Sequence, residues 1–414
     1  MVGHVVLLHA PVGQRRPGLT AERRLQTSST CRRRAASTES EAETSSNTSS
    51  ETSADTVRKQ RLRFLEAVSQ PPVVPSDKGY EVNGVLISGT RGMEMFYGNT
   101  KTAAAFAQLL GKWRDALDDD VRLYSLVVPH ASSYYAPSNY SYLLDYAERS
   151  FDVIADNMPA GVEYVDVYNL FKSHLDEPIY PRTEHHWNAL AAYYAVGELC
   201  RLAGVSYPEL SAFREEVQSG FVGSLYTFSK KQATVLKDNP EDFVFYVPQN
   251  TYTAKFYNRG NYDLSAPNMT RSSCLFDLSG STSGKYATFL GADDYFVHIQ
   301  TELNTGRNLV IFKDSYGNAL APFVATAFDN IYLADIRSYD KNGLDLVRDV
   351  GATDVVFAVS GYTACGSVYT HIERLLITDE GRFRMEDIRK AAANPAAASP
   401  TRSTLASCCG RGGS

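Results

Sequence analysis

Short apolar segments alternate with helical patterns along the second half of the chain. Residues 309–312, Leu-Val-Ile-Phe, are continuously apolar, as expected of a strand covered on both faces. Two further apolar runs, at 331–334 and 354–359, each follow a segment whose apolar residues recur at helical spacing. Strands that alternate with helices form parallel sheets with right-handed crossovers. The chain is therefore predicted to be an α/β protein.

The same alternation occurs earlier in the chain. Residues 121–128 predict a strand, and apolar residues recur at three- and four-residue spacing over 106–117 before it and over 143–154 after it. A second strand is predicted at 163–167 and a helix at 189–202. Together these segments predict a three-layer α/β/α arrangement around one parallel sheet.

The composition divides the chain into a folded part and two tails. Residues 1–55 are rich in Arg, Ser, Thr and Glu without a hydrophobic period, and 391–414 are rich in Ala, Ser, Gly and Pro, so both are predicted to be disordered. The folded domain is predicted to span 56–390 and to begin with a helix at 56–70. Residues 207–303 are rich in Tyr, Asn, Ser and Gly and predict a β-rich insertion.

The overall charge argues against nucleic acid as a partner. A net charge of −6 and a pI near 5.8 do not supply the concentrated basic face that phosphate binding needs. No stretch approaches the roughly 20 apolar residues of a membrane span. The apolar run at 5–8 is shorter than the core of a signal peptide, about 7–15 residues.

A run of polar residues at 182–188, Arg-Thr-Glu-His-His-Trp-Asn, carries the first candidate chemistry. On an extended segment Glu184 and His186 project to the same side, so the carboxylate can accept the imidazole Nδ1–H and leave Nε2 for a nucleophile. Histidines before a helix also serve as caps or packing residues. A zinc site formed by Glu184, His185, His186 and His174 is a further alternative, although no paired-cysteine or H-E-x-x-H motif supports it. We therefore predict no metal and no cofactor.

A second run, Lys-Asp-Ser-Tyr-Gly-Asn at 313–318, directly follows the most apolar strand. A serine at a strand-to-helix turn lies at the carboxyl edge of the sheet, where open α/β sheets bind ligands. Its hydroxyl would be exposed there, and N–H groups at the helix start could stabilise an oxyanion. The alternative is that Asp314 or Ser315 is an ordinary helix N-cap.

Taken together, the two runs resemble a known family. Residues 183–187, Thr-Glu-His-His-Trp, resemble the T-D-H-H-W signature of DHHW-domain proteins, and 309–318 with Pro322-Phe323 resemble that family's "iiKDSYgn…PF" segment. Residues 331–337 resemble its "iyviDpR" strand, and Gly223-Ser224-Leu225-Tyr226 is a further match. The likeness extends over about residues 80–376. The family belongs to the SGNH hydrolase-like superfamily and is related to alginate O-acetylation proteins.

The resemblance implies a flavodoxin-like three-layer fold with circularly permuted SGNH blocks, because the carboxylate–histidine block precedes the serine block. It assigns Ser315 as nucleophile, His186 as general base and Glu184 as the orienting carboxylate. Glu184 stands where the family usually has Asp. No Asn occupies residues 360–362, Ser-Gly-Tyr, where ordinary SGNH members place an oxyanion donor.

The expected function is O-acetyltransferase or acetylesterase activity on a cell-surface or exported polysaccharide, outside the cytoplasmic membrane. The alternative is a glycan-binding or scaffold protein of the cell envelope that has lost turnover. A carbohydrate or acylated small molecule is the expected partner. The residues expected to bind substrate are Arg337, His185, Tyr316, Asn318 and Trp187. His130 and His174 are further candidates for the edge of the pocket, with an ordinary loop or core position as the alternative.

Overall fold

The computed structural model describes residues 78–280 and 282–377. The two tails predicted to be disordered, 1–55 and 391–414, and the helix predicted at 56–70 lie outside the described residues. Within the described part of the chain, no helix combines the length and the apolar character that crossing a membrane requires.

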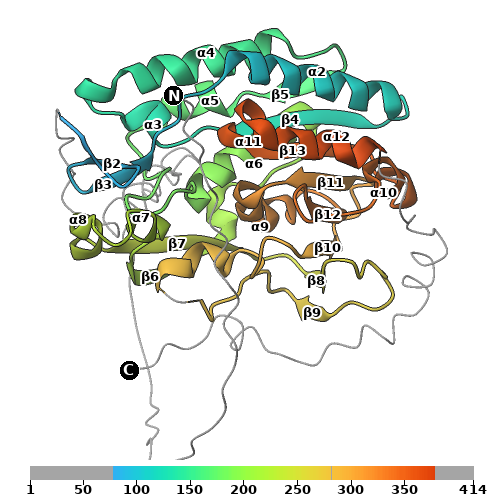
Figure 1. Cartoon of the computed structure of the whole chain (residues 1–414). Coiled ribbons are helices and arrows are strands. Elements are labelled where there is room, and N and C mark those ends of the chain that lie inside the picture. Colours follow the sequence, from blue (N-terminus) through green and yellow to red (C-terminus); the bar gives the residue numbers. More distant parts are fainter. Residues whose placement is uncertain (1–77, 281, 378–414) are drawn as a thin grey trace, which may run out of the picture. The chain divides into compact units, whose positions relative to one another are not determined.

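An eight-stranded sheet forms the centre of the domain, in the order β5-β4-β13-β11-β12-β10-β8-β9 (Figure 1). The first five strands in this order are parallel to their neighbours, whereas β10, β8 and β9 are added antiparallel. In sheet order the strands span Val162–Val165, Arg122–Val128, Asp354–Ser360, Asn308–Lys313, Asn330–Asp335, Phe296–Thr301, Tyr252–Tyr257 and Met269–Ser272. The α/β class predicted from the strand–helix alternation is confirmed.

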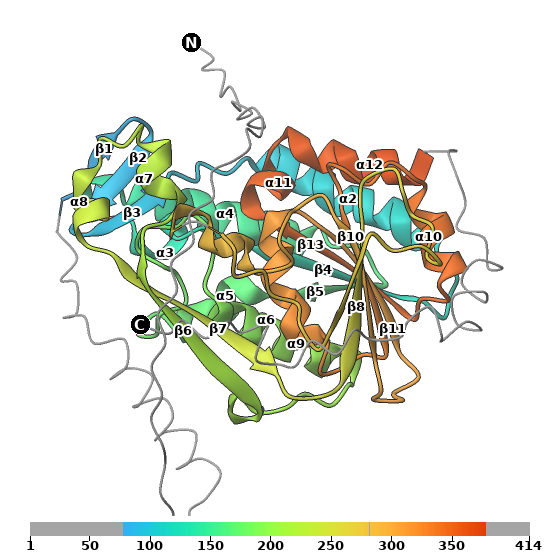
Figure 2. The same ribbon diagram turned by 90° about the horizontal axis from the view of Figure 1, so that it is seen from below.

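Helices cover both faces of the sheet (Figure 2). On β11, Leu309 and Ile311 belong to one apolar cluster, whereas Val310 and Phe312 belong to the other, because successive side chains point to opposite faces. The first face packs against α6, η4 and α9, and the second packs against α2, α10, α11 and α12. These helices, together with α3, α4 and α5, have the following bounds: α2 (Thr100–Ala116), α3 (Ser132–Tyr135), α4 (Tyr142–Asp156), α5 (Val167–Lys172), α6 (Ala189–Ala203), η4 (Ser315–Leu320), α9 (Ala321–Val324), α10 (Gly343–Asp349), α11 (Gly361–Cys365) and α12 (Thr370–Ile377).

The part predicted as a β-rich insertion, 207–303, divides between two sheets. Its strands β6 (Phe213–Phe221) and β7 (Glu241–Pro248) pair with each other as a separate hairpin. Its strands β8, β9 and β10 instead extend the central sheet, since β10 pairs with β12. The expectation of a purely parallel central sheet is therefore wrong at this edge. Alternate residues of β8 are buried, which lets this strand continue the sheet over the same core.

A small three-stranded sheet, β1 (Tyr80–Val82), β2 (Val85–Ser88) and β3 (Arg91–Glu94), packs on two short helices, α7 (Ser224–Phe228) and α8 (Thr234–Asp238). This unit also contacts the histidine segment, because the N–H of Gly92 donates to the carbonyl of Arg182 at 2.8 Å. The start of α7 lies beside Glu184, because the N–H of Ser224 donates to its carboxylate at 2.8 Å.

The helix predicted after Ser315 is broken into two shorter pieces. Residues Ser315–Leu320 form the 3₁₀-helix η4, and Ala321–Val324 form one turn of α-helix, α9. Pro322 has no N–H to donate to the carbonyl four residues earlier, which prevents one continuous α-helix. The tighter first turn keeps Ser315 directly at the end of β11.

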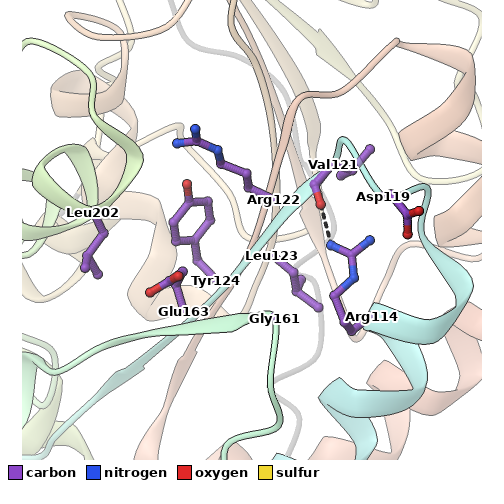
Figure 3. A pocket seen from close by; sticks show the side chains of 9 residues that line it. All are labelled: Arg114, Asp119, Val121, Arg122, Leu123, Tyr124, Gly161, Glu163 and Leu202. Carbon is purple, nitrogen blue, oxygen red and sulfur yellow. Dashed lines mark hydrogen bonds between the residues drawn. The ribbon is translucent and has the colours of Figure 1, made fainter.

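The carboxyl ends of β4, β13, β11 and β12 lie at one edge of the sheet because these strands are parallel. A cavity of about 510 Å³ lies instead at the start of β4 (Figure 3). Its arginines are engaged by the backbone: Arg114 donates to the carbonyl of Val121, and Arg122 donates to the carbonyl of Ala203 at 2.7 Å. This cavity is therefore at the opposite edge from Ser315.

Candidate active site

Ser315 is held at the first position of η4 by its neighbour Asp314. One carboxylate oxygen of Asp314 accepts the N–H of Tyr316 at 3.0 Å, which caps the helix. The other oxygen accepts the N–H of Ser360 at 2.7 Å and the hydroxyl of Thr363 at 2.8 Å. Asp314 is thus the N-cap of η4, and its hydrogen bonds connect the turn after β11 to the turn after β13. Ser315 itself remains partly exposed.

The histidine segment, between α5 and α6, is fixed by a carboxylate from β7. Glu241 accepts the N–H groups of Arg182 and Thr183 at 2.8 and 2.7 Å, and the Thr183 hydroxyl at 2.6 Å. At the other end of the segment, the indole N–H of Trp187 donates to the carbonyl of Tyr316 at 2.9 Å. The segment is therefore anchored on both sides of its two histidines, once directly to the serine turn.

Ser315, His186 and Glu184 form one chain of hydrogen bonds. The distance from His186 Nε2 to Ser315 Oγ is 2.8 Å, and His186 Nδ1 lies 2.9 Å from Glu184 Oε1. Because a carboxylate can only accept, Nδ1 carries the proton and Nε2 is the acceptor for the serine hydroxyl. Tyr286 stacks on His186, with ring centroids 3.7 Å apart and planes 3° apart, and its hydroxyl donates to the carbonyl of Ser315 at 3.0 Å. The imidazole plane is fixed by this stacking.

Besides the imidazole of His186, the carboxylate of Glu184 has further hydrogen-bond partners. The N–H of Ser224, at the start of α7, donates to Glu184 Oε2 at 2.8 Å, and the Ser224 hydroxyl donates to Oε1 at 2.9 Å. His185 Nδ1 lies 2.7 Å from the same Oε1 and 2.5 Å from the Ser224 hydroxyl. Two histidines thus share one carboxylate, and Ser224 bridges it to the outer one.

These contacts shift the pKa values of Glu184, His185 and His186 in different directions. Burial opposes ionisation of Glu184, but the neighbouring His185 and His186 hold its pKa well below the ordinary value. Burial would also lower the pKa of His185, yet the charge of Glu184 raises it to about 9. Burial and the charge of His185 together lower the pKa of His186 to about 4. At neutral pH the histidine that faces Ser315 is therefore the neutral one, as a general base must be.

This arrangement predicts an unusual pH dependence. Because the pKa of His186 is lowered to about 4, its neutral form is present above that pH. An ester hydrolysed through Ser315, such as p-nitrophenyl acetate, should therefore show a kcat/KM that falls only near pH 4. His185→Asn removes the positive neighbour, so the pKa of His186 and the acid limb of the profile should both move to higher pH. His174→Asn is the matched control, since His174 pairs with Glu177 elsewhere. An unchanged acid limb in His185→Asn would contradict the assigned charges.

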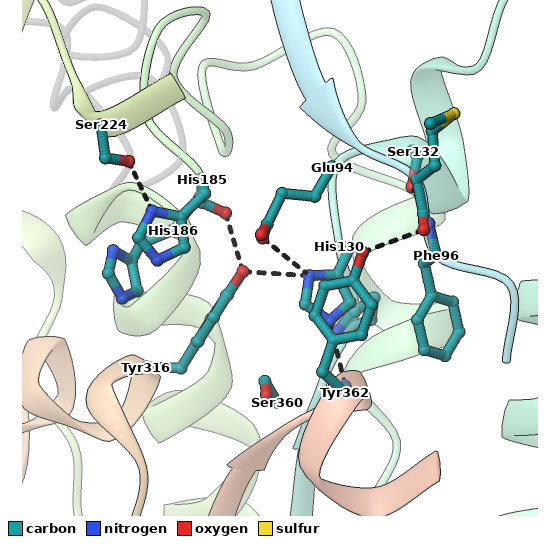
Figure 4. Close-up of polar contacts among 12 residues, drawn as sticks. Glu94, Phe96, His130, Ser132, His185, His186, Ser224, Tyr316, Ser360 and Tyr362 are labelled. Carbon is teal, nitrogen blue, oxygen red and sulfur yellow. Dashed lines mark hydrogen bonds and ion pairs between the residues drawn. The ribbon is translucent and has the colours of Figure 1, made fainter. Parts of the chain in front are cut away.

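Tyr316 and His130 form a second network behind the histidines (Figure 4). The Tyr316 hydroxyl donates to the carbonyl of His185 at 2.7 Å and lies 3.0 Å from His130 Nδ1. His130 Nε2 accepts the N–H of Tyr362 at 3.1 Å, so Nδ1 carries the proton and donates to Tyr316. Burial, together with the nearby His185 and His186, lowers the pKa of His130 to about 3. Neutral His130 thus ties the turns after β4, β11 and β13 to the histidine segment.

A cluster of charged side chains lies on the other side of Ser315, at the end of β12. Arg337 is half-exposed and binds Asp335 through Nε at 2.8 Å and Asp293 at 3.2 Å. Beneath it the buried Lys313 pairs with Asp335 at 3.2 Å. The side-chain amide of Asn318 donates to Asp293 at 2.7 Å. Arg337 is therefore at the surface beside the serine turn, whereas Lys313 and Asn318 support it from within.

The alternative zinc site is only partly assembled. Glu184, His185 and His186 bring possible ligand atoms within 4.8 Å of one another. The fourth candidate, His174, is engaged elsewhere: it binds Glu177 at 2.8 Å and stacks on Tyr194. The Nδ1 atoms of His185 and His186 are both already directed at the Glu184 carboxylate. Pairing of the two imidazoles with this carboxylate is therefore a simpler explanation of the arrangement than metal binding.

The structure brings together the three residues expected to form the catalytic set. Of the residues expected to bind substrate, Arg337 and His185 have exposed surface, whereas the side chains of Trp187, Tyr316 and Asn318 are buried and hydrogen-bonded as described above. Ser224, Tyr286 and Glu241 also contribute to the site and were not predicted from the sequence. A signal for Ser224 was available in the family-like Gly-Ser-Leu-Tyr run; nothing comparable distinguishes Tyr286 or Glu241.

Known proteins resemble this chain in sequence and in fold. The profile of the DHHW protein family matches residues 102–334. A crystal structure of a DHHW family protein from Eubacterium siraeum is similar at 34% sequence identity, over 73% of this chain and 99% of that chain, with a TM-score of 0.66. Bacillus cereus PatB1 with a sulfonyl adduct is similar at 16% identity, over 71% of this chain and 98% of that chain, with a TM-score of 0.55.

The O-acetyltransferase domain of Pseudomonas putida AlgJ matches at 14% identity over 69% of this chain and 90% of that chain, with a TM-score of 0.37. A search of curated proteins found no match. The PatB1 likeness supports the fold, and the family profile together with the Eubacterium siraeum protein supports the family. The chain belongs to the DHHW protein family.

Proposed function

We propose that the protein is a serine acyl-transfer enzyme with Ser315 as nucleophile, His186 as general base and Glu184 as the orienting carboxylate. The observation that carries this proposal is the continuous chain from Ser315 Oγ through His186 to Glu184, at 2.8 and 2.9 Å. The nearly coplanar Tyr286 ring keeps the imidazole in the orientation that the chain needs. A neutral His186 at pH 7 supplies the base form.

In the first step, Ser315 Oγ attacks the ester carbonyl carbon while His186 Nε2 takes the hydroxyl proton. The tetrahedral intermediate collapses when His186 returns that proton to the departing alkoxide, which leaves an acyl group on Ser315. Water or a sugar hydroxyl then attacks the acyl-enzyme while His186 takes its proton. The acyl–oxygen bond to Ser315 breaks as His186 returns that proton to Ser315 Oγ. Glu184 keeps Nδ1–H directed away from the reaction and stabilises the imidazolium formed in each step.

The Ser315 N–H is the proposed first oxyanion donor, because the first N–H groups of a helix have no partner within it. A second donor would not come from the N–H of Ser360 or of Tyr362. The former donates to Asp314 at 2.7 Å and the latter to His130 at 3.1 Å. This fits the missing Asn in the same block of the sequence.

The family resemblance leads us to propose an acetyl ester of a cell-surface or exported polysaccharide as substrate, handled outside the cytoplasmic membrane. The half-exposed guanidinium of Arg337 and the partly exposed His185 are the proposed substrate contacts. We also infer a circular permutation of the SGNH blocks, in which the histidine block precedes the serine block along the chain.

A serine-directed fluorophosphonate probe tests the proposal without knowledge of the natural acceptor. Ser315 should be labelled in the wild type, and Ser315→Ala should lose the label, whereas Ser367→Ala, at an exposed serine, should keep it. A sulfonyl fluoride is a suitable second reagent, since PatB1 has been solved with a sulfonyl adduct. Labelling that persists in Ser315→Ala would refute the proposed nucleophile.

A glycan-binding protein without turnover is the second candidate. It is favoured by the missing Asn at 360–362, where ordinary SGNH members place an oxyanion donor. The N–H groups of Ser360 and Tyr362 have other partners and do not replace it. Absence of any Ser315-dependent labelling in a folded wild type would make this candidate the better one.

A further inference from the structure

A group of surface tyrosines has no part in the acid–base network. Tyr97 follows β3, and Tyr140, Tyr142 and Tyr146 lie in η1 (Ser138–Tyr140) and at the start of α4; we call these four the tyrosine cluster. The rings of Tyr97 and Tyr142 are stacked at 6.4 Å, and Tyr142 contacts the rings of Tyr140 and Tyr146 at 6.0 Å each. Tyr97, Tyr142 and Tyr146 are nevertheless 50%, 41% and 43% exposed. The cluster is thus an aromatic surface held together by its own ring contacts.

The tyrosine cluster lies toward the same edge of the sheet as Ser315. Three members, Tyr140, Tyr142 and Tyr146, come after the carboxyl end of β4 in the chain, and Tyr97 reaches them from the end of β3. β4 is two strands from β11, or roughly 10 Å across the sheet. A chain of contacts joins the two sites: the Tyr97 hydroxyl lies 3.5 Å from the Met95 sulfur, and the Tyr362 hydroxyl donates to the Met95 carbonyl at 2.9 Å. Tyr362 in turn binds His130, which is part of the network behind Ser315.

The types of side chain in the tyrosine cluster indicate which kind of ligand it can bind. It contains rings with hydroxyl groups and no aliphatic side chain; the exposed aliphatic residues of the described chain lie on other elements. Four tyrosines are also far smaller than the roughly 800 Å² per partner of a stable protein interface. A sugar ring, in contrast, has an apolar C–H face and a rim of hydroxyls, which matches the apolar face and polar tip of tyrosine.

The charges around the cluster argue against an anionic polymer. Partial burial, Tyr142 and the negative carboxylate of Glu81 raise the pKa of Tyr97. Asp145 lies on α4 between Tyr142 and Tyr146 and is exposed, and Arg149 follows one turn later. The surface therefore has no excess of positive charge that would attract uronate or phosphate groups.

We propose that the tyrosine cluster is a binding platform for an uncharged polysaccharide, which extends from the edge of the candidate active site across the end of β4. Sugar rings stack on Tyr97 and Tyr142, and the hydroxyls of the cluster bond to the rim of the sugars. The role of this platform in presenting acyl groups to Ser315 rests on the proposed function; the binding itself does not.

Native gel electrophoresis of the full chain through soluble polysaccharides tests this proposal. Hydroxyethyl cellulose, xylan and galactomannan are the uncharged probes, and polygalacturonate is the anionic one. The wild type should be retarded by at least one uncharged polymer, and Tyr97→Ala/Tyr142→Ala should weaken that binding by about 10-fold, since each stacked ring contributes separately. Tyr80→Ala is the matched control, because Tyr80 is 53% exposed but lies on β1, outside the cluster.

The proposal would be overturned if no uncharged polymer retarded the wild type, or if polygalacturonate alone did so. Equal retardation of the wild type and a folded Tyr97→Ala/Tyr142→Ala variant would overturn it too. Loss of a wild-type dimer in that variant, measured by sedimentation, would assign the surface to self-association and overturn it as well. Ser315→Ala should bind as the wild type does. Tyrosine-dependent binding without Ser315 labelling would therefore retain the platform and reject the acyl-transfer function.

Discussion

Ser315→Ala and His186→Ala are each expected to lower kcat for p-nitrophenyl acetate by about 10³-fold or more, and the double variant by little more than either alone. The reason is that the hydroxyl and the imidazole act as a unit. His186 Nε2, 2.8 Å from Ser315 Oγ, has no proton to take without the serine, and the serine is a weak nucleophile without the base. Steady-state kinetics on the full chain, with kcat and KM determined separately, measures the effect.

His174→Ala is the matched control for this prediction, because it removes a partly exposed histidine that also pairs with a glutamate. Its kcat should equal that of the wild type, and circular dichroism should show that all variants remain folded. Two single losses that multiply in the double variant would mean that the two residues act independently. A wild type no faster than the variants would reject ester hydrolysis and favour the glycan-binding alternative.

The candidate catalytic residues could be predicted because their geometry is local. Glu184 and His186 are two positions apart on an extended segment, and Ser315 directly follows the most apolar strand. Each pattern alone also fitted a cap or a packing residue, and Asp314 is in fact the cap at its turn. The family resemblance joined the two patterns, and the distances that now connect them were not available from the sequence.

Residues that support the site from distant elements could not be predicted in the same way. Ser224 is 40 positions from Glu184, and Glu241 is 58 from Thr183. Their contacts depend on how the chain between them folds, and that part of the sequence shows no strong period. The pairing of β10 with β12 was missed for the same reason, because strand partners far apart in sequence are chosen by the tertiary fold. The burial of Trp187 and Tyr316 likewise follows from tertiary packing, since Trp187 contacts the ring of Phe171 and Tyr316 contacts the ring of His130.

Gly223→Ala is expected to lower both the stability and the activity of the protein, although it adds only one methyl group. The added Cβ would lie 2.6 Å from the Cα and Cβ of Glu184 and from the carbonyl of Thr183. The φ angle of Gly223 is −75°, so close approach and not backbone strain requires glycine here. To relieve the clash, the start of α7 must move away from Glu184, which weakens the 2.8 Å bond from the Ser224 N–H. Such overpacking costs about 1–3 kcal/mol in the free energy of unfolding.

Activity should fall further than stability alone explains, because Glu184 orients His186 and a displacement of about 1 Å can cost on the order of 10²-fold in kcat. Gly197→Ala is the matched control. Its Cβ would meet the Tyr207 ring at 3.4 Å, an ordinary contact, and alanine is favoured over glycine within α6 by about 1 kcal/mol. Urea unfolding and p-nitrophenyl acetate kinetics on the two variants separate the effects. A destabilised Gly223→Ala that keeps wild-type kcat would show that α7 absorbs the clash without moving Glu184, and that the contact from Ser224 does not position the carboxylate.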